Sequence, residues 1–334
     1  MQKLKQAAFF HLIGEKITNG KNLVSVVMKL LGLSQNQTYR RINGQTALSF
    51  EDTAILANHF QISLDDLLLD NNDVIGFQFS PIGQPSFSYE MYLKQLDQEL
   101  KQVQQLSGGK LLYATNEFPI FYTFLSPQLV QFKLYMWERT FWEKTAHSNK
   151  LFNLELLEEE TLQLAEDVRS RYHSLDTEEF WSIRLTDNTL HQINYAMESG
   201  LFENQQDILI LCEQLKKMLT QVELMAKNGR KILSQQQKGY KFPEFKLYLN
   251  DLPTNILLLA SSIERSFLYV AFDNPNFIKT DNQKLCHYTH LWFDKLRKKS
   301  LLLSSSAERT RKRFFMDLKK KVTQLEDRVE KLST

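Results

Sequence analysis

Residues 31–50 read LGLSQNQTYRRINGQTALSF, a stretch in which a glycine turn precedes a segment crowded with amide and guanidinium groups. Gly32 is placed to end the apolar helix before it, because glycine readily adopts the left-handed backbone found at helix ends. Ser34 is a suitable N-cap for a second helix over 35–43. The stretch therefore predicts two short helices joined by a tight turn.

The outward face of the second helix carries groups that recognise nucleic acid. Thr38 and Ile42 lie one helical turn apart and can face a core, which turns the other side chains toward solvent. Amides pair with the major-groove edge of adenine, and arginine pairs with guanine. The predicted base-reading residues are Gln35, Asn36, Tyr39, Arg40 and Asn43. The predicted phosphate-binding residues are Lys21, Asn22, Ser34 and Arg41.

Charge reverses sharply along the first 75 residues. Residues 1–48 contain seven Lys or Arg and one Glu, giving +6, whereas residues 49–75 contain six Asp or Glu and no Lys or Arg, giving −6. The whole chain has a net charge of only +2, so the asymmetry is local. This reversal favours one face that meets a polyanion and another face that is kept away from it.

Residues 4–70 resemble the Cro/C1-type (lambda-repressor-like) helix-turn-helix family, through the string VVMKLLGLSQNQTYRRINGQTALSFEDTAILANHFQISLDDLL. Within it, YRRING is similar to the BetR-like branch of bacterial regulators. The resemblance implies a five-helix domain that binds double-stranded DNA through the helix at 35–43, usually as a homodimer on a two-fold operator. The alternative is a small helical domain that is used only for protein contacts.

The rest of the chain is expected to form a larger, mostly helical domain. All seven prolines lie outside residues 1–80 and 128–242, so both spans are free to be helical, with Asp176 as the N-cap of one helix. Strands are expected only near 110–116 and 245–280, in a small antiparallel sheet. The expected fold class is therefore mainly α. The predicted divisions are a DNA-binding domain over 1–72, a linker over 73–90, a regulatory or sensor domain over 91–306 and a C-terminal helix over 307–334.

The C-terminal helix carries an apolar seam whose positions are spaced alternately three and four residues apart. The seam consists of Phe315, Leu318, Val322, Leu325, Val329 and Leu332. Valine alternates with leucine in its second half, which is typical of parallel two-stranded coiled coils. One expectation is a dimer contact through Leu318, Val322, Leu325 and Val329. The other is an amphipathic helix packed on its own domain.

Two further segments have both a functional and a structural interpretation. Cys286 and His290 are four residues apart and have zinc-ligand spacing, but no second Cys/His pair lies near them, so we expect a packed helix and no metal. The aromatic stretch EFPIFYTFLSP (117–127) is suited to lining a pocket for a small apolar effector, although core packing is the commoner use of such residues.

The sequence contains no GxSxG, GxGxxG or HExxH motif, so we expect neither enzymatic activity nor a cofactor. Two cysteines are too few for a disulfide framework, and no stretch approaches the roughly 18 apolar residues of a membrane helix. We expect a cytoplasmic transcriptional regulator that binds DNA, with a C-terminal domain for dimerisation and effector sensing. A protein-interaction adaptor and, less favoured, a nucleic-acid-directed enzyme are the alternatives.

Overall fold

The computed structural model describes residues 2–17, 22–60, 62, 64, 74–79, 88–141, 150–232, 242–251, 256–273 and 275–332. The chain divides into two compact units, Met1–Phe77 and Gln78–Thr334. These are called the N-terminal unit and the C-terminal unit, and each is described by itself. The division falls inside the expected linker of 73–90.

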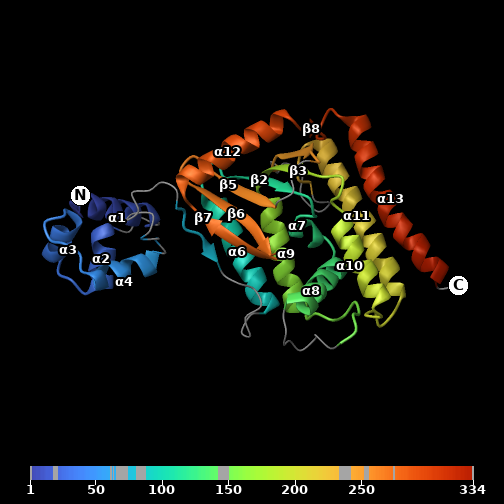
Figure 1. Ribbon diagram of the computed structural model, residues 1–334, viewed down its shortest axis with the longest axis horizontal. Helices are drawn as coiled ribbons and strands as arrows, with labels where there is room; N and C mark the ends of the chain where they lie inside the picture. The colour runs from blue at the N-terminus through green and yellow to red at the C-terminus, as the bar shows by residue number, and fades with distance from the viewer. Residues whose placement is uncertain are drawn as a thin grey trace. The chain divides into compact units, whose positions relative to one another are not determined.

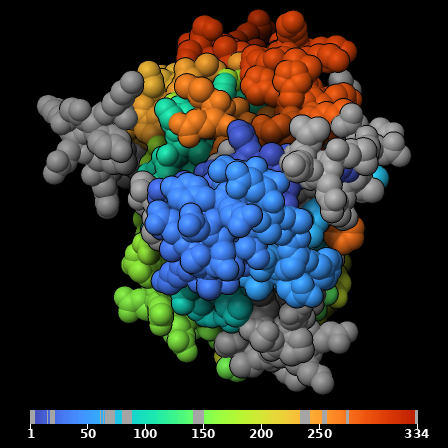
Figure 2. Space-filling model, turned by 90° about the vertical axis from the view of Figure 1, so that its left-hand side faces the viewer, coloured from blue at the N-terminus to red at the C-terminus, as the bar shows by residue number. Residues whose placement is uncertain are grey.

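The N-terminal unit is helical throughout its described secondary structure. Its helices are α1 (Gln2–Lys16), α2 (Leu23–Leu31), α3 (Gln35–Ile42) and α4 (Phe50–Phe60) (Figure 1). They enclose a core that includes Phe9, Phe10, Ile13, Val27 and Leu56. The surface of this unit is the blue region of Figure 2. The fifth helix that the family resemblance implies lies outside the described residues.

The C-terminal unit is built on an eight-stranded mixed sheet with the order β1-β7-β6-β5-β2-β3-β4-β8. The three neighbouring strands β2, β3 and β4 run parallel, and the other pairings are antiparallel. The strands are β1 (Gln78–Phe79), β2 (Lys110–Thr115), β3 (Asp176–Trp181), β4 (Phe245–Leu249), β5 (Leu257–Ser261), β6 (Ser266–Asp273), β7 (Asn276–Thr280) and β8 (Leu301–Leu302).

Helices pack on both faces of this sheet. They are α6 (Tyr89–Gln105), α7 (Ile120–Thr123), α8 (Pro127–Phe141), α9 (Glu159–His173), α10 (Asp187–Glu198), α11 (Gln206–Asn228), α12 (Gln283–Lys298) and α13 (Glu308–Leu332). Side chains alternate along β2, so Leu111 and Tyr113 join the larger core while Leu112 and Ala114 join the smaller one. Phe293 of α12 packs in the smaller core, so α12 covers that face (Figure 1).

The expected mainly α fold with a small antiparallel sheet is wrong, because the sheet is large and has a parallel centre. Asp176 does not cap a helix; it begins β3, and its carboxylate accepts a hydrogen bond from the backbone N–H of Glu244 at 2.6 Å. The strands near 110–116 and 245–280 exist, but β4 pairs in parallel with β3, which follows β2 only after three helices.

The expected dimer contact on the C-terminal helix is also wrong. Its four residues Leu318, Val322, Leu325 and Val329 are buried within the chain, where α13 packs along α11. Ion pairs join α13 to its neighbours, Lys319 to Glu223 of α11 at 2.8 Å and Arg328 to Glu198 of α10 at 2.7 Å. The apolar seam therefore stabilises the C-terminal unit itself, which was the alternative expectation.

Among the described residues, none of the helices combines the length and the apolar character needed to span a bilayer.

Candidate nucleic-acid interface

The turn between α2 and α3 is fixed by its caps. The Asn22 side chain accepts a hydrogen bond from the backbone N–H of Val24 at 2.9 Å and begins α2. Gly32 ends α2 with φ +64°, a conformation that side-chain-bearing residues seldom adopt. Ser34 then begins α3 through a reciprocal capping box with Gln37. The two helices are thus joined by a turn of three residues.

The orientation of α3 about its axis is set by Thr38. This side chain is fully buried, and its hydroxyl donates to the Ser34 carbonyl oxygen at 3.0 Å. With Thr38 turned inward, Gln35, Asn36 and Arg40 are exposed on the outside. Tyr39 is 43 % exposed, although it is a large ring that would otherwise be expected to seek burial. Asn43 is exposed as the C-cap, where its backbone N–H donates to the Tyr39 carbonyl oxygen at 2.9 Å. All five predicted base-reading residues therefore lie on or beside the solvent face of α3.

The predicted phosphate-binding residues are placed differently from one another. Asn22 and Ser34 are the N-caps of α2 and α3, so their side chains are already hydrogen-bonded within the unit. Arg41 forms an ion pair with Asp52 of α4, with 3.2 Å between Nε and Oδ2, and is largely buried. Lys21 lies outside the described residues. Among the described residues of this set, the groups suited to phosphate are therefore the N-termini of α2 and α3 with their caps. The one described cation of the set, Arg41, is paired with Asp52.

Gln6 of α1 holds the loop that follows α3, a role that no sequence motif indicates. Its side-chain amide donates to the carbonyl oxygens of Arg41 at 2.7 Å and Thr46 at 2.9 Å. Its amide oxygen accepts from the backbone N–H of Leu48 at 3.1 Å. The four residues are brought together by folding alone, since 35 or more positions separate Gln6 from each partner. A glutamine in an amphipathic helix carries no local signal for such a contact.

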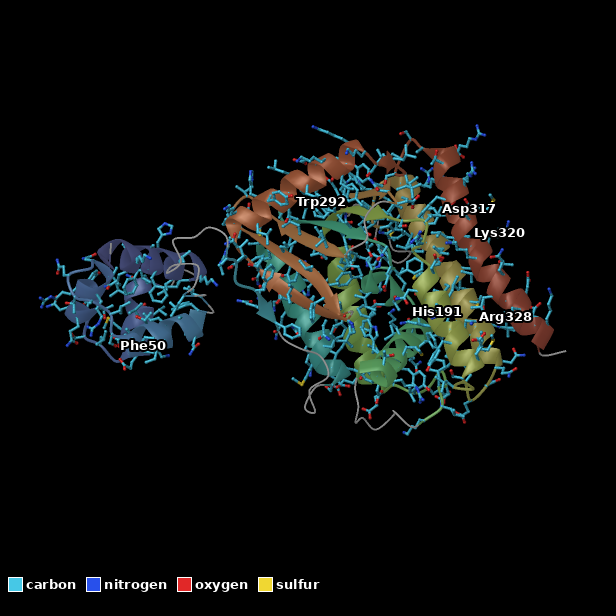
Figure 3. All side chains as sticks on the ribbon, viewed as in Figure 1. Phe50, His191, Trp292, Asp317, Lys320 and Arg328 are labelled. Carbon is cyan, nitrogen blue, oxygen red and sulfur yellow. The ribbon has the colours of Figure 1, made fainter. Side chains whose placement is uncertain are left out.

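Of the six acidic residues in 49–75, the structure describes two. Glu51 is exposed and Asp52 is paired with Arg41, both in the first turn of α4. The other four acidic residues of 49–75 lie outside the described residues. Phe50 begins α4 and is 78 % exposed (Figure 3).

The Cys286 and His290 side chains are not brought together as a metal site. The Cys286 thiol lies 3.6 Å from the Ser266 carbonyl oxygen, buried against the sheet. The imidazole of His290 lies 3.6 Å from the carboxylate of Asp294 instead. Within the described ranges, no group of three His, Cys, Asp or Glu residues is arranged to hold a metal ion.

Comparison of the chain with protein-family models, with curated proteins and with solved structures found no match in any of the three sets. The functional assignment below therefore depends on the residues and geometry of the N-terminal unit.

Proposed function

We propose that the protein is a sequence-specific, DNA-binding transcriptional regulator in which α3 enters the major groove. The observation that carries this proposal is the exposure of amide, phenol and guanidinium groups on one face of α3, while buried Thr38 fixes the opposite face. A helix held in this way fits the width of the major groove and presents its first turns to base edges. The resemblance of residues 4–70 to Cro/C1-type helix-turn-helix regulators supports the same function.

Each exposed group on α3 has a matching role. Arg40 is suited to the two acceptors of guanine, and Gln35 and Asn36 are suited to adenine. The N-termini of α2 and α3 are suited to backbone phosphates, because their N–H groups and helix dipoles attract anions. Arg41 is assigned to the scaffold through its ion pair with Asp52. This division separates residues that read sequence from residues that position the helix.

A single small domain contacts few base pairs, so specificity requires two copies about one helical turn apart. We therefore propose a homodimer that acts in the cytoplasm on a two-fold site. The pairing surface is not the seam of α13, since that seam is buried inside the chain. The C-terminal unit is proposed to supply dimerisation and a response to an effector.

A protein-interaction adaptor is the second candidate, and the exposure of Phe50 favours it. Aromatic side chains are enriched in the cores of protein interfaces. The two functions differ in a simple way, because only the first requires the outward face of α3 to be free.

Enrichment of random DNA duplexes on the purified full chain tests the proposal. The wild type is expected to enrich a palindromic consensus, and the double variant Gln35→Ala/Arg40→Ala is expected to lose it. A matched control, Gln324→Ala/Arg309→Ala, removes the same two residue types from exposed positions on α13 and should retain the consensus. Enrichment of the same consensus by the α3 variant would contradict the assignment of the reading helix.

A further inference from the structure

A cavity of about 110 Å³ lies within the C-terminal unit, between α6, β2, α7, α8 and the strands β5 to β7. Its size is of the same order as that of an engineered apolar cavity of about 150 Å³ that binds benzene. Phe121, from the aromatic stretch 117–127, lines it together with Trp137 and Phe277. The volume and the aromatic walls together suit one flat, six-membered ring.

The wall formed by α6, β2 and α8 also carries polar groups that lack protein partners. Tyr92 and Tyr113 are 3 % and 7 % exposed. Among the described residues, no hydrogen bond is formed by either hydroxyl group. Buried polar groups in proteins are nearly always hydrogen-bonded, so each of these two phenols needs a water molecule or a ligand in the cavity as its partner. Both hydroxyls are free to donate to such a ligand.

Lys133 of α8 adds a cation to the same wall. Its side chain is buried, and its ammonium donates to the Gln192 side-chain oxygen at 3.1 Å. The ammonium also lies 5.6 Å from the centre of the Trp137 ring, and the Tyr92 ring packs against that same tryptophan at 5.4 Å. Only one of the three ammonium hydrogens has a hydrogen-bond partner in the described part of the chain. Burial lowers the pKa of Lys133, against the opposing effect of Glu117.

Among the described residues, one carboxylate lines the cavity, and it is already paired with a cation. Glu99 of α6 accepts hydrogen bonds from the Tyr269 hydroxyl and the Lys279 ammonium, each at 2.6 Å. Glu117 acts electrostatically on Lys133 but does not line the cavity. Glu179 and Glu117 also act electrostatically on Tyr113, but neither lines the cavity, so Lys133 supplies the charge on this wall.

We propose that this cavity binds a small aromatic carboxylate, whose ring lies among the aromatic walls and whose carboxylate accepts hydrogen bonds from Lys133, Tyr92 and Tyr113. Charge-assisted hydrogen bonds of this kind are the strong ones, and they offset the cost of burying an anion. Binding of the ligand to the cavity does not depend on the proposed binding of DNA. The role of the ligand as an effector rests on the proposed function.

A direct structural path leads from the cavity to the start of the C-terminal unit. Phe277 of β7 lines the cavity, and β7 pairs with β1 in the register Gln78 to Lys279. Gln78 immediately follows Phe77, the last residue of the N-terminal unit. Lys279 also holds Glu99 of the cavity wall. The strand β7, which lines the cavity, is therefore hydrogen-bonded to the strand that begins where the N-terminal unit ends.

Calorimetric titration of the full-length protein with benzoate tests the site, with benzyl alcohol and benzylamine as ligands of the same ring and different charge. Benzoate is expected to bind one site per chain, about tenfold or more tightly than benzylamine. Lys133→Met and, separately, Tyr113→Phe should weaken benzoate binding, by about tenfold or more for the lysine. Binding of benzyl alcohol should change far less in Lys133→Met. Tyr195→Phe, at an exposed position of α10, is the matched control and should change nothing.

The absence of saturable benzoate binding would overturn the inference, as would equal benzoate affinity in Lys133→Met and wild type. Tyr113→Phe removes only one oxygen atom, so it keeps the test valid if the lysine variant does not fold. Tighter binding of benzylamine would assign the site to cations and also overturn the inference. The DNA enrichment assay separates the two proposals. Benzoate binding without DNA enrichment defeats the regulator, whereas DNA enrichment without benzoate binding defeats this site.

Discussion

At the scale of single residues, the C-terminal unit depends on a buried carboxylate that no local pattern reveals. Glu179 of β3 is fully buried and accepts hydrogen bonds from the hydroxyls of Tyr122 and Tyr172, at 2.7 Å each. The Thr177 hydroxyl and the Trp181 indole also donate to it, at 3.0 Å and 2.9 Å. A buried carboxylate is tolerated when its lone pairs are satisfied in this way. In the sequence, DTEEFW instead has the polar look of a helix start.

Lys231 is the cationic neighbour of this cluster. It is fully buried, its ammonium donates to the Tyr172 carbonyl oxygen at 2.9 Å, and it lies 3.8 Å from the centre of the Tyr172 ring. Burial lowers the pKa of Lys231 to about 7, against the opposing effects of Glu179 and Asp176. In the unfolded chain the pKa returns to its usual value, so between about pH 7 and pH 10 the unfolded state binds more protons than the native state.

The stability of the wild type is therefore expected to rise with pH through that window. Relative to Lys231→Met, the free energy of unfolding should increase by up to about 1.4 kcal/mol per pH unit between pH 7 and pH 9. Urea unfolding followed by tryptophan fluorescence measures it, because all four tryptophans lie in the C-terminal unit. Lys320→Met, at an exposed site on α13, should parallel the wild type. Parallel curves for Lys231→Met and wild type would show that the ammonium is not destabilised by burial.

At the scale of elements, the helices around residues 22–43 followed from local chemistry, and the sheet did not. Caps and apolar spacing are contained within a few neighbouring residues, so Gly32, Ser34 and Thr38 were enough to place α2 and α3 and to orient α3. A strand such as β3 is buried on both faces, so it lacks the alternation by which strands are recognised. Its partners in β2 and β4 lie 66 and 68 positions away along the chain, beyond the reach of any local pattern. The aromatic stretch 117–127 was expected mainly to pack in the core, and the polar wall of the cavity could not be predicted because it is assembled from three separate elements.

Gln6 is expected to hold the loop after α3 in place. Replacing it with alanine removes three hydrogen bonds and should cost roughly 1–3 kcal/mol in the N-terminal unit. Hydrogen exchange of the amides in 40–48 is expected to become faster, while the tryptophan-monitored unfolding of the C-terminal unit stays unchanged. Unaltered exchange in this loop would mean that the contacts of Gln6 contribute nothing.

The packing of α13 on α11 predicts how stability responds when a buried side chain of α13 is shortened. Leu318→Ala should destabilise the C-terminal unit by about 2–5 kcal/mol, as expected for a fully buried leucine. The change in the free energy of unfolding should be the same at low and at roughly hundredfold higher protein concentration, because no second chain is involved. Met316→Ala, on the exposed side of the same helix, should have little effect. A loss that shrinks as protein concentration rises would instead indicate a dimer seam.

At the scale of the whole molecule, the chain contains two compact units with different proposed tasks. The N-terminal unit is proposed to bind DNA, and the C-terminal unit is proposed to pair two chains and to hold a small ligand. The composition of the whole chain, with a net charge of +2, gave little indication of this division. The charge reversal and the change in residue pattern near 73–90 were better indications of two units. The structural division after Phe77 falls in that segment.

For binding of the full chain to its enriched duplex, the logarithm of the association constant is expected to fall linearly with the logarithm of the salt concentration. The reason is that phosphate contacts release counterions. Arg40→Ala should change base preference with little change in this salt slope, since it is assigned to a base. Fluorescence anisotropy across a salt series measures both. A reduced slope with an unchanged base preference would move Arg40 to the phosphate backbone.

The most direct test of the central claim pairs Arg40 with a single base. In the enriched duplex, each guanine is replaced in turn by 7-deazaguanine, which lacks the N7 acceptor, and binding is measured for the wild type and for Arg40→Ala. The account predicts that one replacement costs the wild type about 1–3 kcal/mol and costs the variant nothing further. An equal cost in both proteins at every guanine would contradict the claim that α3 reads the major groove.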